Sequence, residues 1–116
     1  MAKETLPAIS EQGASGEIAA LYADIRDTLN VSAINYVWRH IATIDGGLRW
    51  AWEAAKPMFV SGRVDGECEH LQAQLAYPDL PALSDTTLQL VGVDRDGREM
   101  IGAILDTYNR GNLLNM

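Results

Sequence analysis

Two short clusters of aromatic, amide and arginine side chains hold the residues best suited to bind or transform a small molecule. The first cluster lies at residues 35–39 and the second at residues 108–112. Their members are Asn35, Tyr36, Trp38, Arg39, Tyr108, Asn109, Arg110 and Asn112. An arginine beside aromatic walls and side-chain amides is a typical clamp for a small carboxylate. We therefore predict a small-carboxylate site if the fold brings the clusters together; packing of the aromatic residues in the core is the alternative.

The other reactive side chains do not form a self-contained catalytic site in the sequence. His40 and His70 fall on separate predicted helices and lack the HxxxH or ExxH spacing of a metal site, so we predict no metal and no cofactor. Cys68 stands on an apolar helix face between two glutamates, which favours a small core residue over a nucleophile. A GxSxG nucleophile elbow and a glycine-rich phosphate loop are both absent.

Composition and charge exclude several classes of protein. The chain has 116 residues, a formal net charge of −7 and nine scattered basic residues, which disfavours nucleic-acid and anionic-membrane partners. Its apolar fraction of 47% is ordinary for a globular domain, so we predict a single domain over residues 1–116. One cysteine, no signal-peptide pattern and no apolar run near the ~18 residues of a membrane span favour a cytoplasmic location.

Helices must position the two clusters, because apolar residues recur at three- and four-residue steps along most of the chain. We predict an all-α fold, a compact orthogonal bundle of about five to six helices, preceded by an extended N-terminal arm at residues 1–13. The predicted helices cover 15–29, 33–43, 45–60, 65–76, a short segment from Ser84, and a last segment from Asp94 or Asp96. Pro57 is expected to kink or restart the third helix.

Helix ends and inward faces follow from the same pattern. Gly111 could end the last helix in a left-handed cap, although the residues after it are apolar enough to continue it. The residues expected on inward faces include Ile34, Val37, Trp38, Ile41, Cys68, Leu71, Leu75, Ile101, Ile104, Leu105 and Tyr108. The third helix is apolar on two sides, which is typical of a helix that is central or covered by a partner.

Several segments resemble the group I 2-haloacid dehalogenase family and occur in the family's order. They are Ser15-Gly16-Glu17-Ile18, residues 22–29, residues 39–43, Ala51-Trp52 and residues 108–112. The resemblance implies an all-helical fold of two related repeats arranged as an internal pseudo-dimer, of which this chain resembles the first. It also implies hydrolysis of 2-haloalkanoic acids by direct attack of an activated water, with an Asp as general base and no covalent ester.

The resemblance assigns roles at some positions and leaves others altered. Asn112 matches the family's water-holding Asn, the one position to which we assign a catalytic role. Tyr36 matches an aromatic pocket position near the family's Arg, here Arg39, while another aromatic wall position falls on Ala33 or Ile34. The family's catalytic Asp lies beyond the first repeat, and none of the aspartates in this sequence aligns with it. The end of the sequence after Asn112 suggests a helix cut short.

Two functions follow from this pattern. The first is a hydrolase that attacks a 2-haloalkanoic acid with an activated water as a homodimer, in which the partner supplies the general base. The alternative is a non-catalytic module that binds a small carboxylate or assists assembly. A peroxidase-like helical domain of the carboxymuconolactone decarboxylase type ranks last, because the sequence has no CxxC pair.

Overall fold

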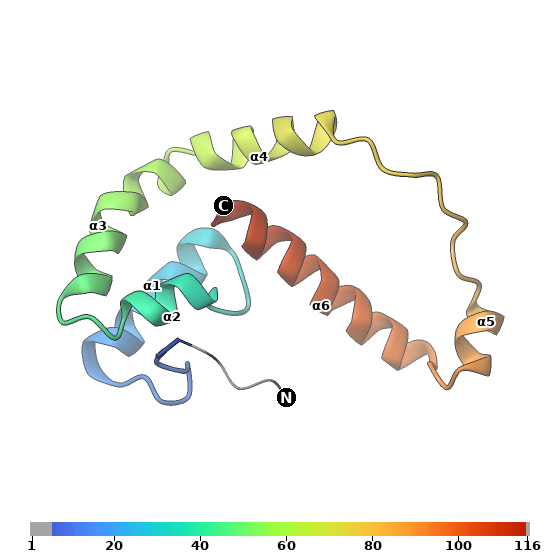
Figure 1. Cartoon of the computed structure of the whole chain (residues 1–116), viewed down its shortest axis with the longest axis horizontal. Helices are drawn as coiled ribbons and strands as arrows, with labels where there is room; N and C mark the ends of the chain where they lie inside the picture. The colour runs from blue at the N-terminus through green and yellow to red at the C-terminus, as the bar shows by residue number, and fades with distance from the viewer. Residues whose placement is uncertain (1–5, 116) are drawn as a thin grey trace.

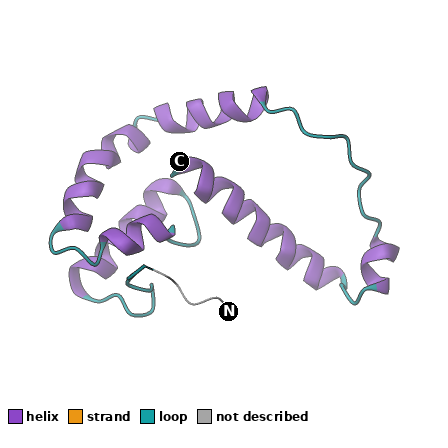
Figure 2. Cartoon of the chain, in the orientation of Figure 1, coloured by secondary structure: helices purple, strands orange, loops and turns teal. Residues whose placement is uncertain are grey.

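The computed structural model describes residues 6–115, and this part of the chain forms helices and no strands (Figures 1 and 2). The helices are α1 (Gly16–Leu29), α2 (Tyr36–Ile41), α3 (Gly47–Val60), α4 (Arg63–Gln74), α5 (Asp85–Leu90) and α6 (Arg95–Leu114). The predicted all-α class is confirmed. Within these residues no helix combines the length and the hydropathy that crossing a membrane requires.

The core lies where α1, α2 and α3 meet the last turn of α6. Its fully buried side chains are led by Tyr22, Ile25 and Trp52, each at most 1% exposed, and Leu114 of α6 joins them at 7%. In α1 the buried residues Tyr22, Ile25 and Leu29 repeat at helical spacing, so one face of this helix enters the core. The core therefore fixes both α2 and the C-terminal end of α6, the elements that carry the two clusters.

Capping residues set the helix starts close to where the sequence predicts them. Ser84 Oγ accepts a hydrogen bond from the Thr87 amide at 3.1 Å, and Asp94 Oδ1 accepts one from the Gly97 amide at 2.8 Å. Ser15 precedes α1 as expected, although its side chain makes no capping hydrogen bond. These contacts satisfy amide groups that have no partner within the first turn of a helix.

The second helix is shorter than the sequence predicts. It begins at Tyr36 because the Asn35 side chain caps it, with Oδ1 accepting from the Val37 amide at 3.0 Å. The residues before Asn35 form a connecting segment instead of a first helical turn. Ile34 belongs to this segment, and its side chain is buried, with 4% of its surface exposed. Val37 was expected on the buried face but is 42% exposed. The cap at Asn35 explains the later start of the helix.

Two helices continue through residues that were expected to interrupt them. Helix α3 runs through Pro57 as one helix, so the predicted restart does not occur. Helix α6 runs through Gly111 to Leu114, and Gly111 is not among the residues with positive φ. Burial of Leu114 in the core stabilises the continuation of α6 beyond Gly111. A left-handed cap at Gly111 would instead turn the chain away from the core.

The helices are arranged more openly than in the compact bundle that the sequence predicts. The radius of gyration is 17.4 Å, against about 13 Å for a compact domain of this length. From α4 a connecting segment, residues 75–84, runs without regular structure to α5, and α6 then returns to the core (Figure 1). Leu71, Leu75 and most of the apolar α6 side chains, expected to point inward, are instead more than 40% exposed.

Candidate functional site

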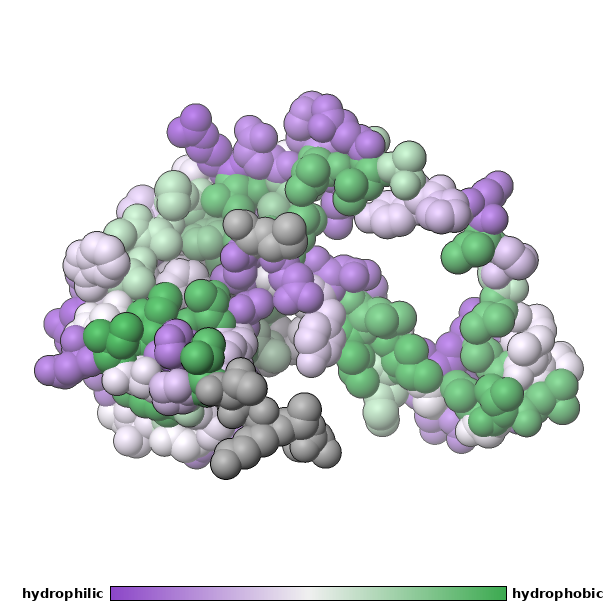
Figure 3. Space-filling model, in the orientation of Figure 1, coloured by the Kyte–Doolittle hydropathy of each residue, from purple (hydrophilic) through white to green (hydrophobic). Residues whose placement is uncertain are grey.

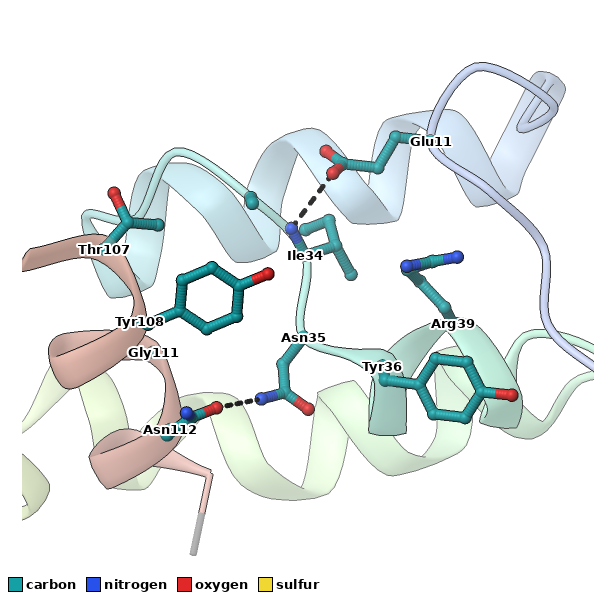
Figure 4. Close-up of a pocket in the computed structure, with 10 residues that line it drawn as sticks. Glu11, Ile34, Asn35, Tyr36, Arg39, Thr107, Tyr108, Gly111 and Asn112 are labelled. Carbon is teal, nitrogen blue, oxygen red and sulfur yellow. Dashed lines mark hydrogen bonds between the residues drawn. The ribbon is translucent and has the colours of Figure 1, made fainter. Parts of the chain in front are cut away.

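A cleft of about 380 Å³ opens where the start of α2 faces the last turns of α6 (Figure 4). The residues that line it are Glu11, Ala33, Ile34, Asn35, Tyr36, Arg39, Thr107, Tyr108, Gly111 and Asn112. Members of both sequence clusters are present, so the fold brings the two clusters together. Helix α6 reaches the cleft because its end is fastened in the core by Leu114.

Two asparagines join the two sides of the cleft. The Asn35 side-chain amide nitrogen donates to Asn112 Oδ1 at 3.4 Å, while Asn35 Oδ1 accepts from the Val37 amide (Figure 4). Because the cap at Val37 fixes the orientation of Asn35, its NH₂ group is directed at Asn112. Asn112 then presents its own NH₂ group as a donor for another acceptor in the cleft.

The N-terminal arm, described here over residues 6–13, is held against α1 and α2. The Tyr36 hydroxyl donates to the Leu6 carbonyl at 2.5 Å, and His40 Nδ1 lies 2.7 Å from the Pro7 carbonyl oxygen. The Ile9 amide donates to the Arg39 carbonyl, and the Tyr22 hydroxyl donates to the Ile9 carbonyl. His40 therefore has a structural contact, and the arm forms one wall of the cleft.

Burial of Tyr22 beneath this arm has an electrostatic consequence. Desolvation raises the pKa of the Tyr22 phenol above its ordinary value, with Arg39 acting in the opposite direction and Glu11 in the same direction. The phenol is therefore a hydrogen-bond donor near neutral pH. It supports the arm and does not act as a proton acceptor.

Glu11 is a charged residue of the cleft that the sequence does not predict. Its Oε1 contacts Arg26 Nη1 of α1 at 2.5 Å, and its Oε2 accepts from the Ile34 amide at 3.2 Å. The carboxylate thereby ties the arm to α1 and to the connection before α2. The sequence predicts only that the arm is extended, and helical periodicity gives no signal for a residue outside the helices.

Arg39 and the two tyrosines give the cleft its shape and charge. The Arg39 guanidinium carbon lies 5.5 Å from the centre of the Tyr36 ring, within the range of a cation–π contact. Figure 4 shows Arg39 and Tyr108 directed towards one another across Ile34. Tyr108 is 61% exposed and forms the open side of the cleft. A cation with two aromatic walls suits a small anionic ligand that carries an apolar group.

Trp38 and Asn109, also expected to contact substrate, do not line this cleft. Trp38 is 7% exposed, donates from Nε1 to Asn115 Oδ1 at 2.6 Å, and packs edge-on against Trp52 with ring centres 5.6 Å apart. Asn109 lines a separate cavity between α4 and α6. Arg110, on the same helix, donates to the Leu29 carbonyl at 2.7 and 3.0 Å and so closes the end of α1.

Cys68 lines the cavity between α4 and α6 and not this cleft. Cys68 is half-buried, and desolvation, followed by nearby Asp65, raises the pKa of its thiol. Over residues 6–115, histidine, cysteine and carboxylate side chains nowhere gather in a group of three or more that could hold a metal ion.

Comparison with known proteins identifies relatives of this chain. None of the protein-family models matches the chain. A configuration-inverting 2-haloacid dehalogenase of Alcaligenes xylosoxydans xylosoxydans is 30% identical over 108 residues, covering 91% of this chain and 36% of that protein. One of Pseudomonas sp. (strain 113) is 27% identical over 110 residues, covering 94% of this chain and 36% of that protein.

Two solved structures are similar to this chain both in fold and in sequence. A D-2-haloacid dehalogenase in complex with L-LA superposes with a TM-score of 0.66 and 26% identity, covering 95% of this chain and 40% of that one. A mutant D-2-haloacid dehalogenase in complex with D-2-CPA gives a TM-score of 0.68 and 27% identity, covering 97% and 41%. The chain thus spans about two-fifths of the length of these relatives, and it is homologous to one part of the configuration-inverting 2-haloacid dehalogenases.

Proposed function

We propose that the cleft binds a small 2-haloacid and forms the substrate-binding and water-holding side of a hydrolytic dehalogenase site. One observation supports this above the others: Tyr36, Arg39, Tyr108 and Asn112 line one cleft in a chain homologous to these enzymes. The homologous structures carry small 2-haloacid or lactate ligands, which match the size and charge that the cleft favours. The substrate class is therefore a short-chain carboxylate with a halogen on its second carbon.

Each residue of the cleft has a distinct role in this reaction. Arg39 pairs with the substrate carboxylate, and the rings of Tyr36 and Tyr108 enclose its carbon chain. Asn112 donates from its NH₂ group to the oxygen of the attacking water. That oxygen bonds to the second carbon as the carbon–halogen bond breaks, so a halide leaves and a 2-hydroxyacid of inverted configuration forms. The proton released from the water passes to a general base.

The general base is proposed to come from a second copy of the chain. Within the described residues, Glu11 is the carboxylate that lines the cleft, and both of its oxygens already accept from Arg26 and Ile34. Neither oxygen is therefore directed at a water held by Asn112. A general base contributes about 10²–10⁴-fold in rate, so a single copy would turn over slowly. A homodimer could supply the missing carboxylate across a two-fold interface.

Halide release tests this proposal directly. We expect the full chain to release chloride from one enantiomer of 2-chloropropionate and to yield lactate of the opposite configuration, as resolved by chiral chromatography. Asn112→Ala should lower the rate of release by at least tenfold. Asn109→Ala, a matched change on the same helix outside the cleft, should leave the rate unchanged. Equal rates in both variants would reject the role of Asn112.

A non-catalytic module that binds a small carboxylate is the second candidate. It is favoured because both carboxylate oxygens of Glu11 already accept from other residues, Arg26 and the Ile34 amide. In that case 2-chloropropionate and lactate would raise the melting temperature in a concentration-dependent way without chloride release. The Asn112→Ala variant would reduce that shift, and the Asn109→Ala variant would not.

A further inference from the structure

Helix α6 carries a row of exposed apolar side chains with no covering element. The row consists of Met100, Ile101, Ile104, Leu105 and Tyr108, which are between 46% and 65% exposed. Their spacing places them along one side of the helix. Figure 3 shows hydrophobic residues gathered along α6 and around α5, beside an opening through the molecule. A contiguous apolar surface of this kind usually marks an interaction site.

Several charged residues lie on the other side of the same helix. Glu99, Asp106 and Arg110 share the face opposite the row by helical spacing, and Arg110 fastens that face to the Leu29 carbonyl of α1. The Thr107 hydroxyl also contacts Ser32 Oγ at 3.0 Å. The helix is therefore held to the body of the molecule by its polar side, and the apolar row faces outward.

The chain as a whole exposes more surface than a compact monomer of its mass. The chain exposes 8787 Å², whereas a compact monomer of this mass exposes about 6200 Å². The excess is on the order of 2500 Å², compared with about 800 Å² that each partner buries in an interface of standard size. Leu90 and Val91, which precede α6 in the sequence, are also apolar and exposed, at 82% and 73%.

We propose that a second copy of this chain covers the row, with α6 of one copy packed against α6 of the other about a two-fold axis. Two copies of a chain with a net charge of −7 repel each other, so their contact requires a surface without like charges, and the row provides one. One copy of the chain spans about two-fifths of the length of each structural relative, so two copies amount to about four-fifths of that length.

Tyr108 links this surface to the candidate site. It belongs to the row and also forms the open side of the cleft. A partner seated on the row would therefore close the cleft and bring its own side chains to the substrate. This consequence rests on the proposed function, whereas the pairing of the two α6 helices does not.

Sedimentation of the full chain tests the pairing. We expect a dimer mass over about 1–100 μM, and Ile104→Glu should raise the dissociation constant by at least a hundredfold, because the symmetry buries the new charge twice. Val60→Glu, a matched change at a residue 67% exposed on α3, should leave the dimer intact. Circular dichroism should show the same helix content in all three proteins, since Ile104 lies outside the core.

Two results would overturn the pairing. One is a monomer mass at the highest concentration, and the other is a dimer that Ile104→Glu does not weaken. The melting shift with 2-chloropropionate, measured on the same samples, separates the two proposals. A dimer without ligand binding would reject the proposed function and leave the α6 interface standing. A monomer that binds ligand would reject the α6 interface and leave the ligand-binding role of the cleft standing.

Discussion

At the scale of single residues, Asn35 performs two tasks with one side chain. Its carbonyl oxygen caps α2 at the Val37 amide, and its NH₂ group contacts Asn112 across the cleft. The cap is a requirement of the fold, and the second contact orients a residue of the candidate site. The stability of α2 and the geometry of the site are therefore joined at this position, and a suitable substitution can separate them.

Asn35→Ser should separate the cap from the site. Serine caps a helix about as well as asparagine, so the free energy of unfolding should change by less than about 0.5 kcal/mol. The shorter side chain cannot reach Asn112, and the affinity for L-lactate should fall about fivefold, as for one lost hydrogen bond of about 1 kcal/mol. Urea unfolding and isothermal titration calorimetry measure the two effects. An unchanged affinity would show that Asn35 does not orient Asn112.

The sequence identified much of the cleft at this scale. Residue type and resemblance predict four site residues that the fold places in one cleft: Tyr36, Arg39, Tyr108 and Asn112. Residue type also predicts Trp38 as a site residue, whereas helical spacing predicts it on the inward face of its helix, and the structure places it in the core. Glu11 could not be found, since its position depends on contacts of the N-terminal arm with α1 and the Ile34 amide.

At the scale of helices, Trp52 holds α3 against α1. The side chain is 1% exposed, its Nε1 donates to Asp24 Oδ2 at 2.7 Å, and its ring stacks on Phe59 with centres 5.9 Å apart. Lys56, one turn further along α3, pairs with the same carboxylate at 2.7 Å. Apolar packing and the contacts of Trp52 and Lys56 with the Asp24 carboxylate thus hold α1 and α3 together, and these two helices support α2.

Trp52→Phe should destabilise the chain while keeping an aromatic ring in the core. The variant loses a hydrogen bond to a charged group, which contributes about 1.5–3 kcal/mol. Trp50→Phe is the matched control, because Trp50 is 75% exposed on the same helix and should change stability by less than about 0.5 kcal/mol. Urea unfolding of both variants measures the difference. Equal stabilities would mean that the indole contact to Asp24 contributes nothing.

Asp24 should make part of the stability depend on pH. Hydrogen bonds from Lys56 and then from Trp52 lower the pKa of its carboxyl below the usual value of 3.8. A carboxyl whose pKa is lower when folded adds stability above its unfolded pKa, and this share is lost as pH falls through the folded pKa. The stability difference between wild type and Asp24→Asn should be constant from neutral pH to about pH 5 and shrink below about pH 4. A difference independent of pH would contradict this assignment.

The helices themselves were largely predictable, but their packing was not. Capping at Ser84 and Asp94 and the periodicity of α1 are local signals, and the structure follows them. Whether an apolar face meets the chain's own core or another surface is not a local property. The apolar spacing of Ile101, Ile104 and Leu105 therefore predicted burial, and the structure leaves all three exposed.

At the scale of the whole molecule, an open chain places a cleft beside an uncovered apolar row. The N-terminal arm, α2 and the end of α6 form the cleft, while the rest of α6 extends away from the core with α5 at its far end (Figure 1). Covering the row would bury apolar area and narrow the cleft at Tyr108 in the same step. We therefore expect ligand affinity to rise with protein concentration over the range in which the dimer forms, which calorimetry at several concentrations measures.

The cleft is the centre of the proposed function, and nuclear magnetic resonance of the side-chain amides tests it most directly. On titration with 2-chloropropionate, we predict that the NH₂ signals of Asn35 and Asn112 and the backbone signals of Thr107 and Gly111 shift together along one binding curve. The indole signal of exposed Trp50 should stay in place. Shifts that gather around the cavity lined by Asn109, or no shift at any of these groups, would contradict a 2-haloacid site between α2 and α6.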